Sequence, residues 1–116
     1  MGKAVELGKG YVQAVNDKDI DTLLGYFRED GVLYHPFGTF EGPDKIAEFY
    51  TGLVFHADTE VTLNSACGDD NMSALELVGI SPQAPDDPQY ACDIFKLDDT
   101  GKLETLRIYY LNTVGG

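Results

Sequence analysis

Apolar residues in the first half of the chain recur every three or four positions, as they do along one face of an α-helix. The pattern predicts helices over residues 2–16, 19–27 and 43–55. An aspartate at the start of the second helix can cap it, and a proline suits the first turn of the third. In the first helix the apolar set is Val5, Leu7, Tyr11, Val12 and Val15.

From residue 59 onward, apolar and polar positions alternate, which is typical of strands with one buried face. Gly, Pro, Asn and Asp mark the turns between these strands. A short strand is also expected to end at Pro36, which forces the preceding residue into an extended conformation. The predicted strands are 32–35, 59–67, 72–80, 89–97 and 103–111, with a tight return at 37–42 and turns at 68–71, 81–88 and 98–102.

Helices followed by strands predict an α+β domain, in which three N-terminal helices pack on one face of an antiparallel sheet. A curved sheet closed by helices forms a cone with a pocket inside, which is a natural place for a ligand. The chain of 116 residues is long enough for one such domain and too short for two, so we expect a single domain over residues 1–116.

The composition of the chain restricts the kinds of molecule that the protein is expected to bind. Twenty acidic against eight basic side chains give a formal charge of −12, which repels nucleic acid and anionic membranes. We therefore expect a neutral, hydrophobic small molecule as the ligand. The chain has 43% hydrophobic residues and no run long enough to span a bilayer, and its first residues lead into polar sequence. These features predict a soluble, cytoplasmic protein.

Neither a metal nor a disulfide is expected. Cys67 and Cys92 fall in predicted strands with no metal-ligand spacing around them, and we interpret both as small buried apolar residues. His35 and His56 have no ligand spacing with the scattered acids, and no glycine-rich phosphate loop is present.

Asp93 is the most informative candidate residue. Strand alternation places it on the same face as Ala91, Phe95 and Leu97. An ionised carboxyl on an apolar face is costly, so it either finds a partner or stays protonated and donates a hydrogen bond. Arg107 on the next predicted strand is the candidate partner, although alternation directs it to the opposite face from Leu106 and Ile108.

Other polar residues each have a structural and a functional interpretation. His35 is either a strand-end histidine bonded to the backbone or a general base. Tyr11 and Tyr50 are either ordinary core residues of amphipathic helices or a functional pair. Glu76 either faces solvent, which we expect, or is a second acid in the pocket, and His56 is expected to cap a helix or lie on the surface.

Four segments together resemble bacterial Δ5-3-ketosteroid isomerase, within the nuclear transport factor 2-like superfamily. The resemblance covers nearly the whole chain and is weakest over residues 55–88. That superfamily has cone-shaped α+β domains and also includes dehydratases, polyketide cyclases and non-catalytic members. The segments are Gly10–Asn16 with Asp19–Asp21, His35–Gly38, Gly42–Tyr50, and Asp93 with Phe95.

The resemblance implies roles for these residues. In the isomerase, a tyrosine and a protonated aspartic acid form an oxyanion hole, and Tyr11 and Asp93 match them. Tyr50 matches a tyrosine that supports the first. The resemblance further implies that no cofactor is needed and that the protein is a homodimer. The positions that resemble pocket-lining residues are Phe49, Phe95, Leu106, Ile108 and Tyr110.

One residue departs from the isomerase pattern. His35 stands where the family has an aspartate general base before a proline. Imidazole can also remove and return a proton, but it becomes charged when it does so, and it then forms an ion pair with an enolate. The set of tyrosine, histidine and aspartate also resembles the dehydratases of the superfamily. The sequence thus predicts an isomerase that shifts a double bond next to a carbonyl, with a dehydratase or cyclase, or a non-catalytic binding module, as alternatives.

Overall fold

The structure is a computed structural model that describes residues 2–111. Its helices precede most of its strands, as the sequence pattern predicts. The elements in chain order are α1 (Lys3–Asp17), α2 (Ile20–Gly25), β1 (Phe27–His35), β2 (Gly38–Glu41), α3 (Gly42–Phe49), the π-helical segment η1 (Tyr50–Val54), β3 (Glu60–Gly68), β4 (Met72–Ser81), β5 (Ala84–Leu97) and β6 (Leu103–Tyr110).

The strands form one curved sheet in the order β2-β1-β6-β5-β4-β3. Neighbouring strands are antiparallel except β1 and β6, which run parallel. The last strand therefore lies between β1 and β5 and joins the β1–β2 hairpin to the β3–β5 meander. This arrangement confirms the α+β class with a curved sheet and N-terminal helices.

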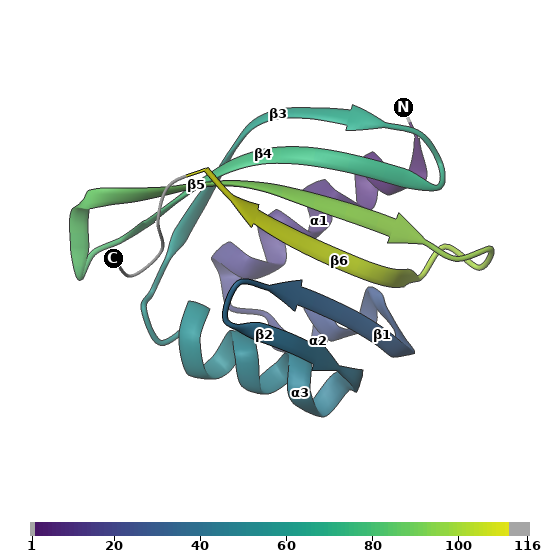
Figure 1. The fold of residues 1–116 in the computed structure, drawn as a ribbon, viewed down its shortest axis with the longest axis horizontal. Helices are drawn as coiled ribbons and strands as arrows, with labels where there is room; N and C mark the ends of the chain where they lie inside the picture. Colours follow the sequence, from purple (N-terminus) through teal and green to yellow (C-terminus); the bar gives the residue numbers. More distant parts are fainter. Residues whose placement is uncertain (1, 112–116) are drawn as a thin grey trace.

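The helices cover the concave face of the sheet (Figure 1). α1 packs against β3, β4 and β5, whereas α3 packs against β1 and β2. α1 presents Tyr11, Val12 and Val15 to the sheet, because residues three and four apart lie on one helix face. The core between the layers includes the fully buried residues Leu23, Leu33, Ile46, Leu75, Phe95, Leu103 and Leu106.

The second helix ends earlier than predicted. α2 stops at Gly25, and Phe27 already belongs to β1, where it pairs with Leu103 of β6. The backbone N–H of Leu103 also donates to the carbonyl of Tyr26. Pairing with a strand more than seventy residues away thus overrides the local helical spacing, and the predicted boundary at Phe27 was wrong.

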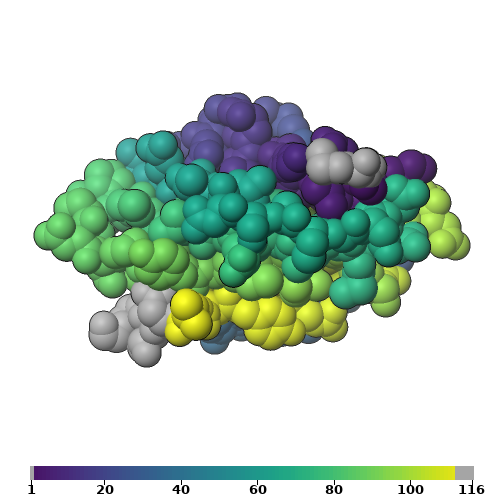
Figure 2. All heavy atoms as spheres, turned by 90° about the horizontal axis from the view of Figure 1, so that it is seen from above, coloured from purple at the N-terminus to yellow at the C-terminus, as the bar shows by residue number. Residues whose placement is uncertain are grey.

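Two segments predicted as turns are partly strands. Gly38–Glu41 pairs with β1, so the tight return is a β-hairpin. The predicted turn at 81–88 shortens, because Ser81 pairs with Ala84 and β5 begins there. The prolines of this segment lie where the register between β4 and β5 shifts, and a bulged ladder tolerates the missing N–H of proline. This β4–β5 hairpin protrudes at one end of the molecule in both views (Figures 1 and 2).

The interpretation of both cysteines as buried residues was wrong. Cys67 is exposed and Cys92 is partly exposed, and both are free thiols. They lie on the outer face of the sheet, where alternation also places the exposed Glu76, as predicted. His56 is exposed after η1. Among residues 2–111, none of the helices has the length and apolar character that crossing a membrane requires.

Candidate active site

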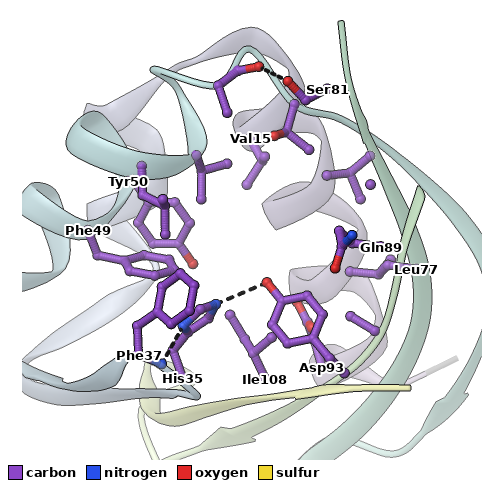
Figure 3. Close-up of a pocket in the computed structure, with 18 of the residues that line it drawn as sticks. Val15, His35, Phe37, Phe49, Tyr50, Leu77, Ser81, Gln89, Asp93 and Ile108 are labelled. Carbon is purple, nitrogen blue, oxygen red and sulfur yellow. Dashed lines mark hydrogen bonds between the residues drawn. The ribbon is translucent and has the colours of Figure 1, made fainter. Parts of the chain in front are cut away.

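The cone encloses a cavity of about 290 Å³, which is close to the size range of small-molecule sites. Its walls come from α1, the α3–η1 segment and the concave face of the sheet, and most of the lining is apolar (Figure 3). The polar side chains that line it are Tyr11, His35, Tyr50, Thr59, Ser81, Asp87, Gln89, Asp93 and Tyr110.

Tyr11 and Tyr50 form a hydrogen-bonded pair at the cavity wall. Their hydroxyl oxygens are 2.6 Å apart, and both side chains are almost completely buried. Burial raises the pKa of Tyr11 well above its usual value, and the neighbouring Tyr50 adds to this; burial also raises the pKa of Tyr50. Both phenols are therefore neutral near pH 7. If Tyr50 donates to Tyr11, the proton of Tyr11 is left for a ligand oxygen.

Asp93 is a buried carboxyl with no counter-ion among the described residues. Its side chain is 3% exposed, and Oδ1 has no hydrogen-bond partner among residues 2–111. Burial raises the pKa of Asp93 to about 8, because the charged form loses its hydration. The carboxyl also raises the pKa of Tyr11, Tyr50 and Tyr110, which line the same cavity. At neutral pH Asp93 is therefore mostly a neutral acid.

Arg107 does not neutralise Asp93. In the sheet Asp93 pairs with Ile108, whereas Arg107 pairs with Ile94 and points to the opposite face. There its guanidinium lies 4.6 Å from the ring centre of Tyr34 on the outer side of the sheet. The alternative of a structural Asp93–Arg107 ion pair is thus not realised.

His35 lies at the end of β1, with its ring in the cavity and 8% exposed. The rings of Phe37, Phe49 and Tyr110 surround it, with centroids 4.7–5.3 Å from its own. Burial lowers the pKa of His35 to about 4. The imidazole is therefore neutral at physiological pH and can accept a proton there.

Two hydrogen bonds determine the tautomer of this imidazole. The backbone N–H of Phe37 donates to Nδ1 at 3.1 Å, so Nδ1 carries a lone pair. In a neutral ring the proton then resides on Nε2, which lies 3.0 Å from the hydroxyl oxygen of Tyr110 and donates to it. The Phe37 contact follows from the turn after Pro36, which brings the N–H of Phe37 back toward the ring.

The structure brings most of the predicted site residues to the cavity. Those that line it are Tyr11, His35, Phe49, Tyr50, Asp93, Ile108 and Tyr110. Phe95 and Leu106 do not line it. Both are fully buried in the core beneath it, where the ring of Phe95 packs edge-on against Tyr11 with centroids 5.1 Å apart.

The protruding hairpin supplies lining residues that the sequence interpretation missed. Gln89 shares a strand face with Asp93, and the same alternation that located Asp93 could have located it; Ala91, which alternation had placed on that face, also lines the cavity. Ser81, Ala84 and Asp87 could not be found in this way, because residues 81–88 were predicted to be a turn. Within the described part of the chain, no three His, Cys, Asp or Glu side chains gather as metal ligands.

A buried acid of this kind should cost the protein stability at neutral pH. Asp93 ionises at an ordinary pKa when unfolded but at about 8 when folded, so folding takes up a proton between these values. The penalty is absent below the unfolded pKa, grows as pH rises, and is complete above 8. We expect Asp93→Asn to be more stable than the wild type by up to about 4 kcal/mol at pH 7 and about equally stable at pH 4. Urea unfolding at several pH values measures this, and a difference independent of pH would contradict it.

Comparison of the sequence with known protein families identifies the family of this chain. The sequence profile of the SnoaL-like domain matches residues 9–104, which is most of the chain. The chain belongs to the SnoaL-like domain family. No curated protein matches the sequence.

Solved structures share the SnoaL-like architecture at low sequence identity. A candidate ketosteroid isomerase from Kribbella flavida is 13% identical, with 98% of this chain and 82% of that chain covered and a TM-score of 0.83. A candidate polyketide cyclase from Sinorhizobium meliloti is 19% identical, with 85% and 89% covered and a TM-score of 0.76. A Mycobacterium tuberculosis protein in complex with estradiol-17beta-hemisuccinate is 13% identical, with 94% of each chain covered and a TM-score of 0.78. At these identities the similarity establishes the fold of this SnoaL-like domain.

Proposed function

We propose that the protein is an isomerase that shifts a double bond next to a carbonyl in a hydrophobic substrate through an enolate. The observation that carries this proposal is Asp93, a buried carboxyl that has no counter-ion within residues 2–111 and faces a mostly apolar cavity beside two neutral phenols. A neutral acid in such a place donates a hydrogen bond to a developing oxyanion more strongly than water does.

In this mechanism Tyr11 and Asp93 bind the carbonyl oxygen of the substrate. As negative charge grows on that oxygen, both hydrogen bonds strengthen, which lowers the barrier to removal of the neighbouring proton. Tyr50 holds Tyr11 in place through the 2.6 Å hydrogen bond and orients its hydroxyl. The charge is stabilised by hydrogen bonds from the protein, so the proposed reaction needs no cofactor.

His35 is the proposed base that takes the proton and returns it to the distal carbon. To accept at Nε2 it must first move its proton to Nδ1, which gives up the hydrogen bond from Phe37 at a cost of about 1 kcal/mol. The imidazolium that forms then lies beside the enolate in a pocket of low polarity, where opposite charges attract strongly.

The proposed substrate is of steroid or polyketide size. Its apolar body would contact Phe49, Leu77 and Ile108 on different walls of the cavity. The similar structures support this class, since one is a candidate ketosteroid isomerase, one a candidate polyketide cyclase, and one binds an estradiol ester. We also propose that the protein acts as a homodimer, as the resemblance implies.

The proposal is tested with a β,γ-unsaturated ketosteroid, whose conjugated product absorbs in the ultraviolet. Purified protein should raise the rate of conjugation well above the buffer rate. Absence of turnover would contradict the proposal for steroids. A non-catalytic binding module would bind phenols or enones in the cavity without converting them.

A dehydratase or cyclase is the second candidate, and the tautomer of His35 favours it. With Nε2–H directed at Tyr110, the pair can donate a proton to a departing hydroxyl. Asp93 in its ionised form would then remove the proton next to the carbonyl. In the isomerase His35 is the base and Asp93 is the protonated acid. In the dehydratase or cyclase Asp93 is the base, and His35 with Tyr110 supplies the proton.

The pH dependence of kcat/KM should separate the two candidates. Isomerisation with His35 as the base requires a neutral imidazole and a protonated Asp93, so activity should rise through pH 4 and fall through pH 8. A reaction with Asp93 as the base should instead rise as Asp93 ionises near pH 8. Initial rates measured from pH 4 to 9 at low substrate concentration distinguish a plateau around neutral pH from a continuous rise.

A further inference from the structure

Gln89 carries a second buried polar atom without a partner in the cavity. Its side-chain oxygen Oε1 is buried and accepts no hydrogen bond among residues 2–111, a state it shares with Asp93 Oδ1. Leaving a buried acceptor unpaired costs free energy, so each such group in a ligand cavity is a candidate ligand contact.

The orientation of the Gln89 amide is fixed by a backbone contact. Its Nε2 donates to the carbonyl oxygen of Asp87 at 3.2 Å. Exchanging Nε2 and Oε1 would set two acceptor oxygens against each other, because the Asp87 carbonyl cannot donate. The unpaired atom of the amide is therefore the acceptor Oε1. Figure 3 shows the amide at the cavity wall on the side of β5. A small turn about the soft terminal torsion of glutamine can direct the oxygen toward a bound group without exchanging it with Nε2.

The two side chains with an unpaired oxygen, Gln89 and Asp93, lie on one line along β5. Gln89, Ala91 and Asp93 alternate onto the concave face, and the outer two are four positions apart, which is roughly 13 Å at the usual rise of a strand. Between them the small side chain of Ala91 leaves room, and its neighbour in the sheet is the apolar Leu77. The cavity thus has a polar group near each end of an apolar wall.

We propose that Gln89 is a specificity contact for a hydroxyl at the far end of the substrate, opposite the oxygen bound by Tyr11 and Asp93. Because Oε1 only accepts, the ligand group there must be a donor, and a ketone would place two acceptors against each other. The substrate class is an elongated, rigid, apolar hydroxyketone with its two oxygens at opposite ends. This inference rests on the proposed function for the orientation of the substrate, and it adds a contact that the reaction itself does not need.

Three phenolic steroids that differ only at the far end test this contact: estradiol with a hydroxyl, estrone with a ketone, and 17-deoxyestradiol with neither. The wild type should bind estradiol about tenfold more tightly than either of the others, by isothermal titration calorimetry. Gln89→Met keeps the length of the side chain and removes the acceptor, so the three dissociation constants should come within about twofold. If that variant does not fold, Gln89→Leu replaces it.

Gln13 provides the matched control, because it is exposed on α1 outside the cavity. Gln13→Met should keep the preference for estradiol. The inference is overturned if the wild type binds the three steroids equally, if it binds none of them, or if the preference survives in Gln89→Met. The proposed function is tested by a separate readout. If the protein prefers estradiol but converts no unsaturated ketone, the Gln89 contact is supported and the isomerase assignment is contradicted.

Discussion

His35→Ala is expected to lower kcat/KM for isomerisation of a β,γ-unsaturated ketone by about 10²–10⁴-fold, the usual loss when a positioned general base is removed. The ring lies in the cavity, burial lowers its pKa to about 4, and at pH 7 it is neutral and accepts a proton at Nε2 once its own proton has moved to Nδ1. Alanine leaves the substrate pocket open but supplies no group that can take the proton.

Proton exchange isolates this step from the rest of the reaction. A bound ketone in heavy water should exchange its α-proton with the wild type and lose this exchange in His35→Ala. His56→Ala is the matched control, because His56 is exposed and lies outside the cavity. Exchange that persists in His35→Ala would remove His35 from the base role and favour Asp93 in its place.

Asp93→Ala should lower kcat/KM by about 10²–10³-fold, as does the loss of one donor from an oxyanion hole elsewhere. Asp93→Asn should lose much less, about tenfold, because the amide keeps an N–H donor of nearly the same shape. The same ranking is expected for the binding of a phenolate, which resembles the enolate in charge and geometry.

The comparison of these two variants separates a chemical role from a structural one. If Asp93 acts only through packing, alanine and asparagine should weaken phenolate binding equally. Leu97→Ala, on the same strand face but outside the cavity, controls for a loss of core packing. It should lower stability by about 2–5 kcal/mol and leave phenolate binding by the folded protein unchanged.

Alternation along a strand is the part of this fold that sequence predicts best. It placed Asp93 on the concave face and Arg107 on the other, and register in the sheet confirms both. The reason is physical: a strand with one buried face has a strict period of two, so a single apolar neighbour fixes the direction of every side chain. The amphipathic face of α1 is predicted equally well, since Val5, Tyr11, Val12 and Val15 are buried. In the third predicted helix Ile46, Phe49 and Tyr50 are buried, whereas Leu53 is exposed.

The features that the sequence did not predict depend on contacts between residues that lie far apart along the chain. Nothing local marks Phe27 as a strand residue, because its pairing with Leu103 is made across most of the chain. The hairpin at 81–88 contains prolines and acids that are typical of a turn, yet a register shift lets it continue as a strand and bring Gln89 to the cavity. The tautomer of His35 depends on Phe37 and Tyr110, and the second of these lies 75 residues away.

The position of β6 between β1 and β5 has a consequence for biosynthesis. A ribosome makes the chain from the N-terminus, so the β1–β2 hairpin and the β3–β5 meander emerge before the strand that joins them. Until residues 103–110 are available, two sheet edges remain unpaired, and His35 cannot meet Tyr110. The cavity is therefore completed only after residues 103–110 have been made, and nascent chains depend on β6 to cover edges that otherwise favour aggregation.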